Sequence, residues 1–361
     1  MAYRFDNGFA KTVEVYEKYW KGELDRGLFP VIVRGETDRP QPPKGRIHGC
    51  TQLLFANREI PPKELVDCIE YALSGLEYLG DAFPYVNMDF SGPGLVAALV
   101  GGKLGASDHG IWFSSEKEAE LADMHFEYDA GNYWLNRIKD ITLECKSRFG
   151  KEVVLGIPDL GGAIDILASL RGTQNLLMDF YDAPEEIKRL INELSGLWHI
   201  FFEEIAALYC RDNVYTNWSG LLSRESSYMF QADFAYMIGP EMFDEFLLPE
   251  LKYSFGKVKR ACYHLDGTGE LPHLDSLLQS EDLKLVQWIP GAGTTSVDHW
   301  IDVHNKILNA GKLLQACDDR EKQLDKIIET RGSLKGVASL PMTFEKKDRG
   351  EALRLLEKYS Y

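Results

Sequence analysis

The stretch from Arg260 to Gly293, RACYHLDGTGELPHLDSLLQSEDLKLVQWIPGAG, decides the predicted fold of this chain. Two short apolar runs, 260–264 and 284–288, each end in polar and glycine-rich residues, and a helix-like segment at 271–278 lies between them. A strand, a helix and a second strand in this order form the unit that builds parallel sheets. Parallel α/β folds place their ligands at the carboxyl ends of the strands. The side chains at or just after these two strand ends are His264, Asp266, Gln287 and Trp288.

Apolar runs of the same kind recur along the rest of the chain. Together with the two above, they make eight candidate strands, most of them followed by a helical pattern. Eight such units with right-handed crossovers predict a closed parallel (β/α)8 barrel, the TIM barrel, and an open doubly wound sheet is the alternative. The further predicted strands are 28–35, 83–90, 153–157, 214–218, 313–316 and 334–339, and the main predicted helices are 9–20, 61–80, 116–149, 184–208 and 345–358.

No linker, short repeat or low-complexity tract divides the chain. We therefore predict one domain over residues 1–361. In this prediction, residues 1–80 hold the N-terminal helices, the first strand and a long loop, and residues 81–361 form the main body of the barrel.

The charge and cysteine content restrict the classes of partner and location. Lysine and arginine number 40 against 56 aspartates and glutamates, so the formal net charge is −16. Such a charge repels phosphate backbones and anionic lipids, which argues against nucleic acid and membranes as partners. The six cysteines form no C-x-x-C pair, no apolar run approaches the roughly 18 residues of a membrane span, and residues 1–20 lack a signal-peptide core. We expect a cytoplasmic protein with reduced thiols.

His264 and Asp266 form the most informative pair. Residues two apart on an extended segment face the same side, so the imidazole and the carboxylate can converge on a metal ion or on a reacting atom. Cys317, at the end of the run 313–316, is the thiol placed to serve as a third metal ligand, although a small buried cysteine has a structural role more often. Without a metal, His264 and Asp266 can act as an acid–base pair.

Further polar and aromatic residues follow other predicted strands. Asp89 closes the run 83–90 beside a Gly-Pro-Gly loop and can accept a proton or bind an NH-bearing ligand, or it can cap a turn. The other candidate residues lie in the glycine-containing loop PDLGGAID and in a long insert after residue 218. Capping of the following helix explains the two aspartates of the first loop equally well. The expected substrate-binding residues are Asp159, Asp165, Trp218, Gln231, Asp233, Gln287 and Trp288.

The order of these motifs resembles the uroporphyrinogen decarboxylase superfamily, which also contains the methylcobamide:thiol methyltransferases. The resemblance runs from about residue 83 to the C-terminus. Its most specific marker is IGPEMFDEFLLPELK at 238–252, which is similar to the family's Ser-Pro-x-x-Phe-x-x-Phe-x-x-Pro signature with Gly239 in place of Ser. The other markers are YVNMDF (85–90), VLGIPDLGGAIDIL (154–167), DAPEEIKRLI (182–191), YHLDG (263–267) and KLLQACDD (312–319). The resemblance implies a (β/α)8 barrel and a homodimer.

The resemblance also separates the two branches of the superfamily. Asp89 matches the acid that binds pyrrole NH groups in the decarboxylases, but their tyrosine, expected near Ala168, and their C-terminal histidine, expected in 337–340, are absent. The methyltransferases bind zinc through His-x-Cys and a later Cys. Here His264 matches the histidine, Asp266 replaces the first cysteine, and residues 337–339 contain no cysteine.

The expected function is therefore corrinoid-linked methyl transfer to or from a small molecule. A methylcobamide on a separate corrinoid carrier protein is the expected methyl donor. Zinc or another divalent metal is the expected ion, with His264, Asp266 and Cys317 as its ligands. One alternative is a lyase that decarboxylates a tetrapyrrole or another carboxylic acid. The other is a non-catalytic barrel that binds a small molecule.

Overall fold

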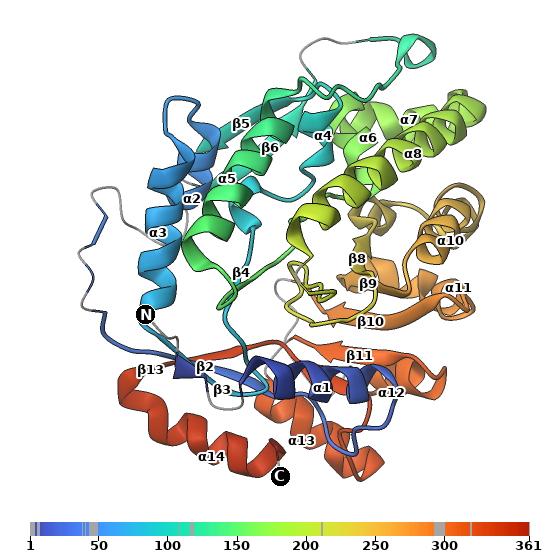
Figure 1. Ribbon diagram of the computed structural model, residues 1–361. Coiled ribbons are helices and arrows are strands. Elements are labelled where there is room, and N and C mark those ends of the chain that lie inside the picture. Colours follow the sequence, from blue (N-terminus) through green and yellow to red (C-terminus); the bar gives the residue numbers. More distant parts are fainter. Residues whose placement is uncertain are drawn as a thin grey trace.

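A five-stranded parallel sheet forms the centre of the computed structural model (Figure 1). In spatial order its strands are β12 (Val337–Ser339), β11 (Leu313–Ala316), β10 (Leu283–Ile289), β9 (Arg260–Asp266) and β8 (Ser227–Gln231). Each strand lies beside its neighbour in the sequence, as the strand-helix-strand pattern predicts. The structure describes residues 4–5, 8–37, 39, 41–42, 50–107, 109–115, 119–210, 212–291, 300–317 and 320–360, without the side chains of Arg4, Phe5, Cys50, Asp89 and Arg320.

Shorter sheets continue the arrangement. Strand β2 (Pro30–Arg34) pairs in parallel with β13 (Met342–Glu345) and antiparallel with β3 (Leu76–Gly80), which also pairs with β1 (Arg4–Phe5). A parallel bridge between Leu28 and Ala338 joins this sheet to β12. Strands β4 (Tyr85–Val86) and β7 (Val154–Leu155) form a parallel pair, which a bridge from Ile157 to Asn217 extends.

Helices surround these strands. Figure 1 shows α14 beside β13, and α10 and α11 on the outer side of β9 and β10. The pairings within the described residues establish a mixed α/β fold with parallel strands, and they do not form a continuous ring. The helices are α1 (Phe9–Trp20), α2 (Cys50–Ala56), α3 (Pro62–Ser74), α4 (Val96–Leu99), α5 (Tyr133–Phe149), α6 (Ala163–Arg171), α7 (Thr173–Asp182), α8 (Pro184–Tyr209), α9 (Pro240–Met242), α10 (Leu248–Lys257), α11 (Leu274–Leu278), α12 (Ile301–Asn309), α13 (Arg320–Arg331) and α14 (Arg349–Ser360). Short turns are η1 (Asp89–Ser91), η2 (Leu121–Asp123), η3 (Asp233–Met237), the π-helical η4 (Phe243–Leu247), η5 (Thr268–His273) and η7 (Lys346–Asp348), and β5 (Lys103–Ser107) pairs with β6 (Gly110–Ser114).

The register of the five-stranded sheet sorts its inward-facing side chains into two rows. Partners in adjacent parallel strands point to the same face, and successive residues alternate between faces. The apolar row, nearer the amino ends of the strands, contains Met229, Cys262, Leu285 and Leu313. The polar row, two residues further along each strand, contains Gln231, His264, Gln287 and Gln315.

Helix α1 covers the apolar row. Its Tyr16 and Tyr19 are buried and belong to the same core cluster as Cys262 and Leu285. The Tyr16 ring packs edge-on against Phe83 at 5.7 Å between ring centroids, and the Tyr19 hydroxyl donates to the Leu314 carbonyl at 3.2 Å. The amphipathic helix predicted at 9–20 thus closes the amino end of the sheet, which leaves the carboxyl end for polar side chains.

A register shift between Leu283 and Leu285 decides which side chains of β10 face inward. Leu283 pairs with Ala261, whereas Leu285 pairs with Cys262, so one residue is inserted in β10. An inserted residue reverses the faces of everything that follows it. As a result Gln287 pairs with His264 and faces inward, and Trp288 faces the helices.

Several predicted elements differ from the structure. Residues 76–80, predicted as the end of a helix, form β3, because α3 ends at Ser74 with Gly75 as its C-cap and the next residues pair with β2. A side chain at Gly80, whose φ is +61°, would place Cβ 2.6 Å from the Phe29 carbonyl oxygen, so only glycine fits this turn. The leucine spacing that favoured a helix also fits a short strand, and five residues cannot distinguish the two periods.

Other differences lie in segments with weak periodicity. The helix predicted at 116–149 begins at Tyr133, and the strand predicted at 214–218 forms only isolated bridges at Tyr215 and Asn217. Strand β8 lies in the long insert that follows residue 218, and the β5–β6 hairpin lies in a segment for which no strand or helix was predicted. Strand β8 is stabilised by its parallel pairing with the distant strand β9, whereas β5 and β6 pair with each other across a short connection. In the part of the chain that the structure describes, no helix has the length and apolar character needed to cross a membrane.

Candidate functional site

Asp233, His264 and Asp266, here called the acid–histidine cluster, meet at the carboxyl ends of β8 and β9. One potential ligand atom from each residue lies within 4.8 Å of those of the other two. His264 and Asp266 are two residues apart on β9 and face the same side, with 3.9 Å between Nε2 of His264 and Oδ2 of Asp266. Asp233 is the first residue of η3, directly after the parallel strand β8. The cluster is partly open to solvent, so a small molecule or an ion can reach it.

Two further aspartates lie behind the cluster, and their carboxyl groups are electrostatically coupled to Asp233. Asp165, in the first turn of α6, accepts hydrogen bonds from the backbone N–H groups of Asp233 (3.1 Å) and Phe234 (2.8 Å). Asp159 accepts from the N–H of Gly161 at 2.8 Å. Burial, reinforced by the charge of Asp233, raises the pKa of Asp165, and burial raises the pKa of Asp159 to about 6. A cation bound at this end of the sheet would favour the ionised form of both carboxyl groups and lower their pKa.

A chain of buried amides supports His264 from the other side. The Oε1 atom of Gln287 forms a short hydrogen bond with Nδ1 of His264, and Nε2 of Gln287 donates to Oε1 of Gln315 at 2.7 Å. Nε2 of Gln315 in turn donates to the Ser219 carbonyl at 3.0 Å. Both glutamines are 1% exposed, so these contacts exclude water and hold the imidazole in one orientation. We call Gln287, Gln315 and the Ser219 carbonyl the glutamine relay.

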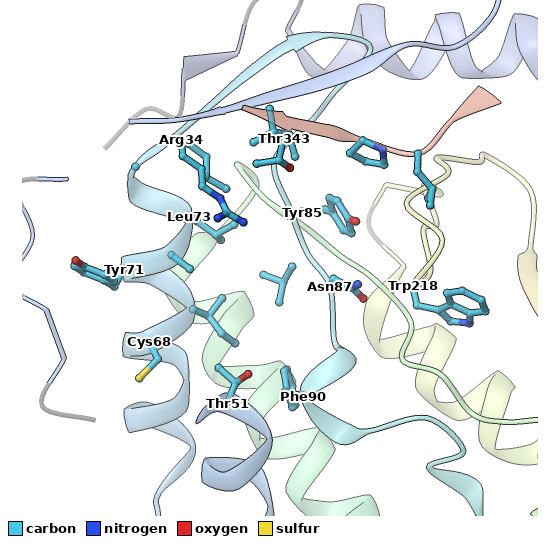
Figure 2. A pocket seen from close by; sticks show the side chains of 18 of the residues that line it. Arg34, Thr51, Cys68, Tyr71, Leu73, Tyr85, Asn87, Phe90, Trp218 and Thr343 are labelled. Carbon is cyan, nitrogen blue, oxygen red and sulfur yellow. The ribbon is translucent and has the colours of Figure 1, made fainter. Parts of the chain in front are cut away.

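A cavity of about 770 Å³ lies beside two side chains that contact His264. Gln287 and Trp218 line it, and the Trp218 ring packs edge-on against His264 at 5.3 Å. Figure 2 shows Trp218 on the side away from α3, with the Arg34 and Thr343 side chains at the end near β2 and β13. Among the lining residues that the structure describes, Arg34 is the basic one, and most of the others are apolar. The cavity therefore suits a small ligand with an apolar body.

The structure brings most of the predicted site residues together. Asp233, His264 and Asp266 form the cluster, Gln287 and Trp218 contact His264, and Asp159 and Asp165 lie behind it, as described above. Gln231 is 7% exposed and pairs with His264 in the register of β8 and β9. Gly162 lies so close to this strand end that a Cβ there would be 2.1 Å from the Gln231 carbonyl oxygen. The loop PDLGGAID thus approaches the end of β8 through this glycine.

Three of the predicted site residues are not part of the cluster in the described structure. Trp288 is fully buried on the opposite face of β10, where its ring packs against Trp300 at 5.4 Å, so the prediction that it lines the cavity requires correction. The Cys317 Sγ lies 3.7 Å from the Gln315 carbonyl oxygen, and Asp233 takes the third position that we expected the thiol to fill. The backbone of Asp89 belongs to η1, but its side chain lies outside the described residues.

Sequence reasoning missed Gln315 and Arg34 as parts of the site. Gln315 is a polar residue within the apolar strand LLQA, and this is the signal that could have identified it. Buried amides are rare in strand interiors unless a partner satisfies them. Arg34 ends β2, another strand that leads into the cavity, although its side chain also lies 3.7 Å from Glu345.

The donor set of the cluster fits a divalent metal ion. One imidazole nitrogen and two carboxylate oxygens are typical ligands of zinc, manganese or iron, and they leave coordination positions open for a substrate. The hydrogen bond from His264 to Gln287 is the kind of outer contact that orients a metal-binding imidazole. The set differs from the thiolate set of the zinc methyltransferases, because it contains two carboxylates and no cysteine.

Comparisons with known proteins bear on the fold. No protein-family model matches the chain, and no curated protein sequence matches it. Its structure is similar to that of a methyltransferase from Methanosarcina mazei, with a TM-score of 0.56 and 13% sequence identity. The match covers 92% of this chain and 93% of that one. This chain therefore shares its α/β fold with a methyltransferase over nearly the whole length of both proteins.

Proposed function

We propose that this protein is a (β/α)8 enzyme of the uroporphyrinogen decarboxylase superfamily that transfers a methyl group to or from a small molecule. The observation that carries this proposal is the acid–histidine cluster at the carboxyl ends of β8 and β9, whose His264 contacts two side chains, Gln287 and Trp218, that line a cavity of about 770 Å³. The order of sequence motifs and the fold shared with a methyltransferase support the choice of reaction. The co-substrate in this proposal is a methylated corrinoid on a separate carrier protein.

Asp233, His264 and Asp266 would hold a divalent ion in this enzyme. When bound, such an ion lowers the pKa of a coordinated thiol or hydroxyl and so makes the acceptor a better nucleophile. Asp165 keeps Asp233 in place through the two backbone hydrogen bonds at the start of η3. The bound ion would then neutralise the negative charge of Asp233 and Asp266, which water would otherwise solvate.

The remaining residues bind the acceptor and move its proton. Asp159, with a pKa of about 6, is a suitable base for the proton that the acceptor loses, because its carboxylate form predominates near neutral pH while it can still be reprotonated. Trp218 and the apolar walls of the cavity exclude water from the acceptor. Arg34 offers a positive charge to an anionic group at the far end of the ligand.

Metal analysis combined with a methyl-transfer assay tests the proposal. Purified protein should contain about one divalent ion per chain and should demethylate methylcobalamin in the presence of a thiol or hydroxyl acceptor, which the cobalamin absorbance reports. His264→Ala and Asp266→Ala should each lower the metal affinity and the transfer rate at least about 100-fold, because each removes a direct ligand. His125→Ala is the control, since that histidine is 66% exposed and distant from the cluster.

The possible outcomes separate the alternatives. Transfer at the wild-type rate by both His264→Ala and Asp266→Ala would refute the proposal. Activity that depends on His264 in a metal-free protein would instead assign the cluster an acid–base role. Release of carbon dioxide from uroporphyrinogen would support the decarboxylase alternative. We expect none, because the decarboxylase tyrosine and histidine are absent from this sequence.

A further inference from the structure

The glutamine relay ends on a group that can act only as an acceptor. The Ser219 carbonyl accepts from Gln315, and Ser219 itself is held in a tight turn in which its N–H donates to Oδ1 of Asn217 at 2.9 Å. Ser219 and Asn217 are both buried, at 1% and 0% exposure. The carbonyl therefore has a defined position, and it determines the polarity of every hydrogen bond that follows it in the relay.

The polarity can be traced from this carbonyl to the imidazole. Because Ser219 O only accepts, Gln315 must direct its NH2 group toward it and its Oε1 toward Gln287. Because Oε1 of Gln315 only accepts, Gln287 must direct its NH2 group there, at 2.7 Å, and its Oε1 toward His264. Oε1 of Gln287 then requires a donor, and the nitrogen that faces it is Nδ1 of His264. The proton of the neutral imidazole is thus assigned to Nδ1.

This assignment has a consequence for the other ring nitrogen. With the proton on Nδ1, Nε2 presents a lone pair, and it faces the Asp266 carboxylate at 3.9 Å and lies in a group with Asp233. A lone pair and two carboxylates repel one another unless a cation lies between them. The distance of 3.9 Å between Nε2 of His264 and Oδ2 of Asp266 is longer than a hydrogen bond. Two atoms that bind the same ion are likewise not in direct contact with each other.

We propose that Gln315 and Gln287 are positioning residues that hold His264 in its Nδ1-protonated tautomer, so that Nε2 and the carboxylates of Asp233 and Asp266 together accept a divalent cation. The tautomer follows from the relay alone. The role of the cation rests on the proposed function. Gln315 therefore affects the metal site through two intervening side chains without contacting it.

Nitrogen NMR of the full-length protein labelled with ¹⁵N-histidine tests the tautomer directly. His264 is assigned as the signal that is missing from the spectrum of His264→Gln. In protein treated with a chelator, two-bond ¹⁵N–¹H correlations should show a protonated, pyrrole-type Nδ1 and a pyridine-type Nε2. Addition of zinc should shift Nε2 and leave Nδ1 protonated.

Two variants of Gln315 test the relay. Gln315→Leu removes both hydrogen bonds, and we expect His264 to show averaged tautomer signals and zinc affinity to fall about tenfold, as loss of outer contacts does in other metal sites. Gln315→Glu should restore both properties below the pKa of the new side chain, because a buried neutral carboxyl group can donate to Ser219 O and accept from Gln287. Calorimetric titration with zinc measures the affinity.

Gln323→Leu provides a matched control. Gln323 is also a fully buried glutamine hydrogen-bonded to a histidine, with 3.0 Å between its Nε2 and Nε2 of His304. This pair lies between α12 and α13, away from the cluster. The substitution should change the His304 signals alone and leave the His264 signals and the zinc affinity unchanged.

Each outcome decides a separate point. A wild-type spectrum with the proton on Nε2, or with both nitrogens protonated, overturns the proposal, and so do unchanged His264 signals in Gln315→Leu. If Gln315→Leu fails to fold, the wild-type spectrum and Gln315→Glu still decide the matter. An Nδ1-protonated His264 in a protein that binds no zinc, manganese or iron would uphold the tautomer and refute the metal site of the proposed function.

Discussion

The two inward-facing rows of the five-stranded sheet come from the same strands, two residues apart, and have opposite physical characters. In the apolar row, Met229, Cys262 and Leu285 are fully buried and pack with helix α1. In the polar row, His264 and Gln287 form hydrogen bonds to side chains, and Gln287 lines a cavity. The apolar row stabilises the fold through burial, whereas the polar row leads to a group of aspartates whose partial burial carries a cost in stability. The comparison shows that the residues that stabilise the fold and the residues of the candidate site occupy different positions along the same strands.

The largest effect should come from a cavity in the apolar row. Leu285→Ala removes a fully buried side chain two residues before Gln287, and we expect the free energy of unfolding to fall by about 2–5 kcal/mol. Urea denaturation measures this change, and Leu353→Ala, at a leucine that is 42% exposed, is the control. If the two rows are independent, the zinc affinity of the folded variant should equal that of the wild type. A parallel loss of affinity would contradict the comparison.

A change behind the polar row should act in the opposite direction. Asp159 has a pKa of about 6 in the folded chain, above its ordinary 3.8, so the folded state binds the proton more tightly than the unfolded state. Its contribution to stability is therefore present below about pH 3.8 and is lost as the pH rises through 6, by up to about 3 kcal/mol. Asp159→Asn keeps an oxygen for the Gly161 N–H but cannot ionise. We expect the variant to be more stable than the wild type by about 1–3 kcal/mol near pH 8 and equally stable near pH 3.5.

Denaturation across this pH range, in the presence of a chelator, tests the sign of the effect. The chelator is needed because a bound ion would stabilise the carboxylates. Asp182→Asn, at an exposed aspartate that ends α7, is the control and should show no such dependence. A wild type more stable than Asp159→Asn near pH 8 would mean that the buried carboxyl group behind the polar row does not reduce stability.

The smallest effect concerns the contact between α1 and the sheet. Tyr19→Phe keeps the buried ring but removes the hydrogen bond from the hydroxyl to the Leu314 carbonyl. We expect the free energy of unfolding to fall by about 0.5–1.5 kcal/mol, with no change in zinc affinity. The same denaturation measurement applies, with Tyr253→Phe, at a tyrosine that is 50% exposed, as the control. A larger loss would assign α1 a greater role in closing the amino end than packing alone suggests.

Local pattern predicted much of the central sheet. The strands predicted at 260–264, 284–288 and 313–316 are present as β9, β10 and β11, and the helix that opens at Pro184 extends to Tyr209. These segments have apolar residues at one clear period, so neighbouring residues were sufficient to identify them. Strands β3 and β8 were missed because distant backbone partners stabilise their extended conformation, and no pattern within five residues reports such partners.

For the candidate site, the sequence by itself determined that His264 and Asp266 share a face, because the period of an extended strand is local. Only the tertiary structure decided which residues of other strands join them. It brought Asp233 into the cluster in place of Cys317, and the register shift between Leu283 and Leu285 turned Gln287 inward and Trp288 outward. The physical reason is that register depends on hydrogen bonds between segments far apart in the chain, and a shift of one residue reverses the face of every side chain that follows.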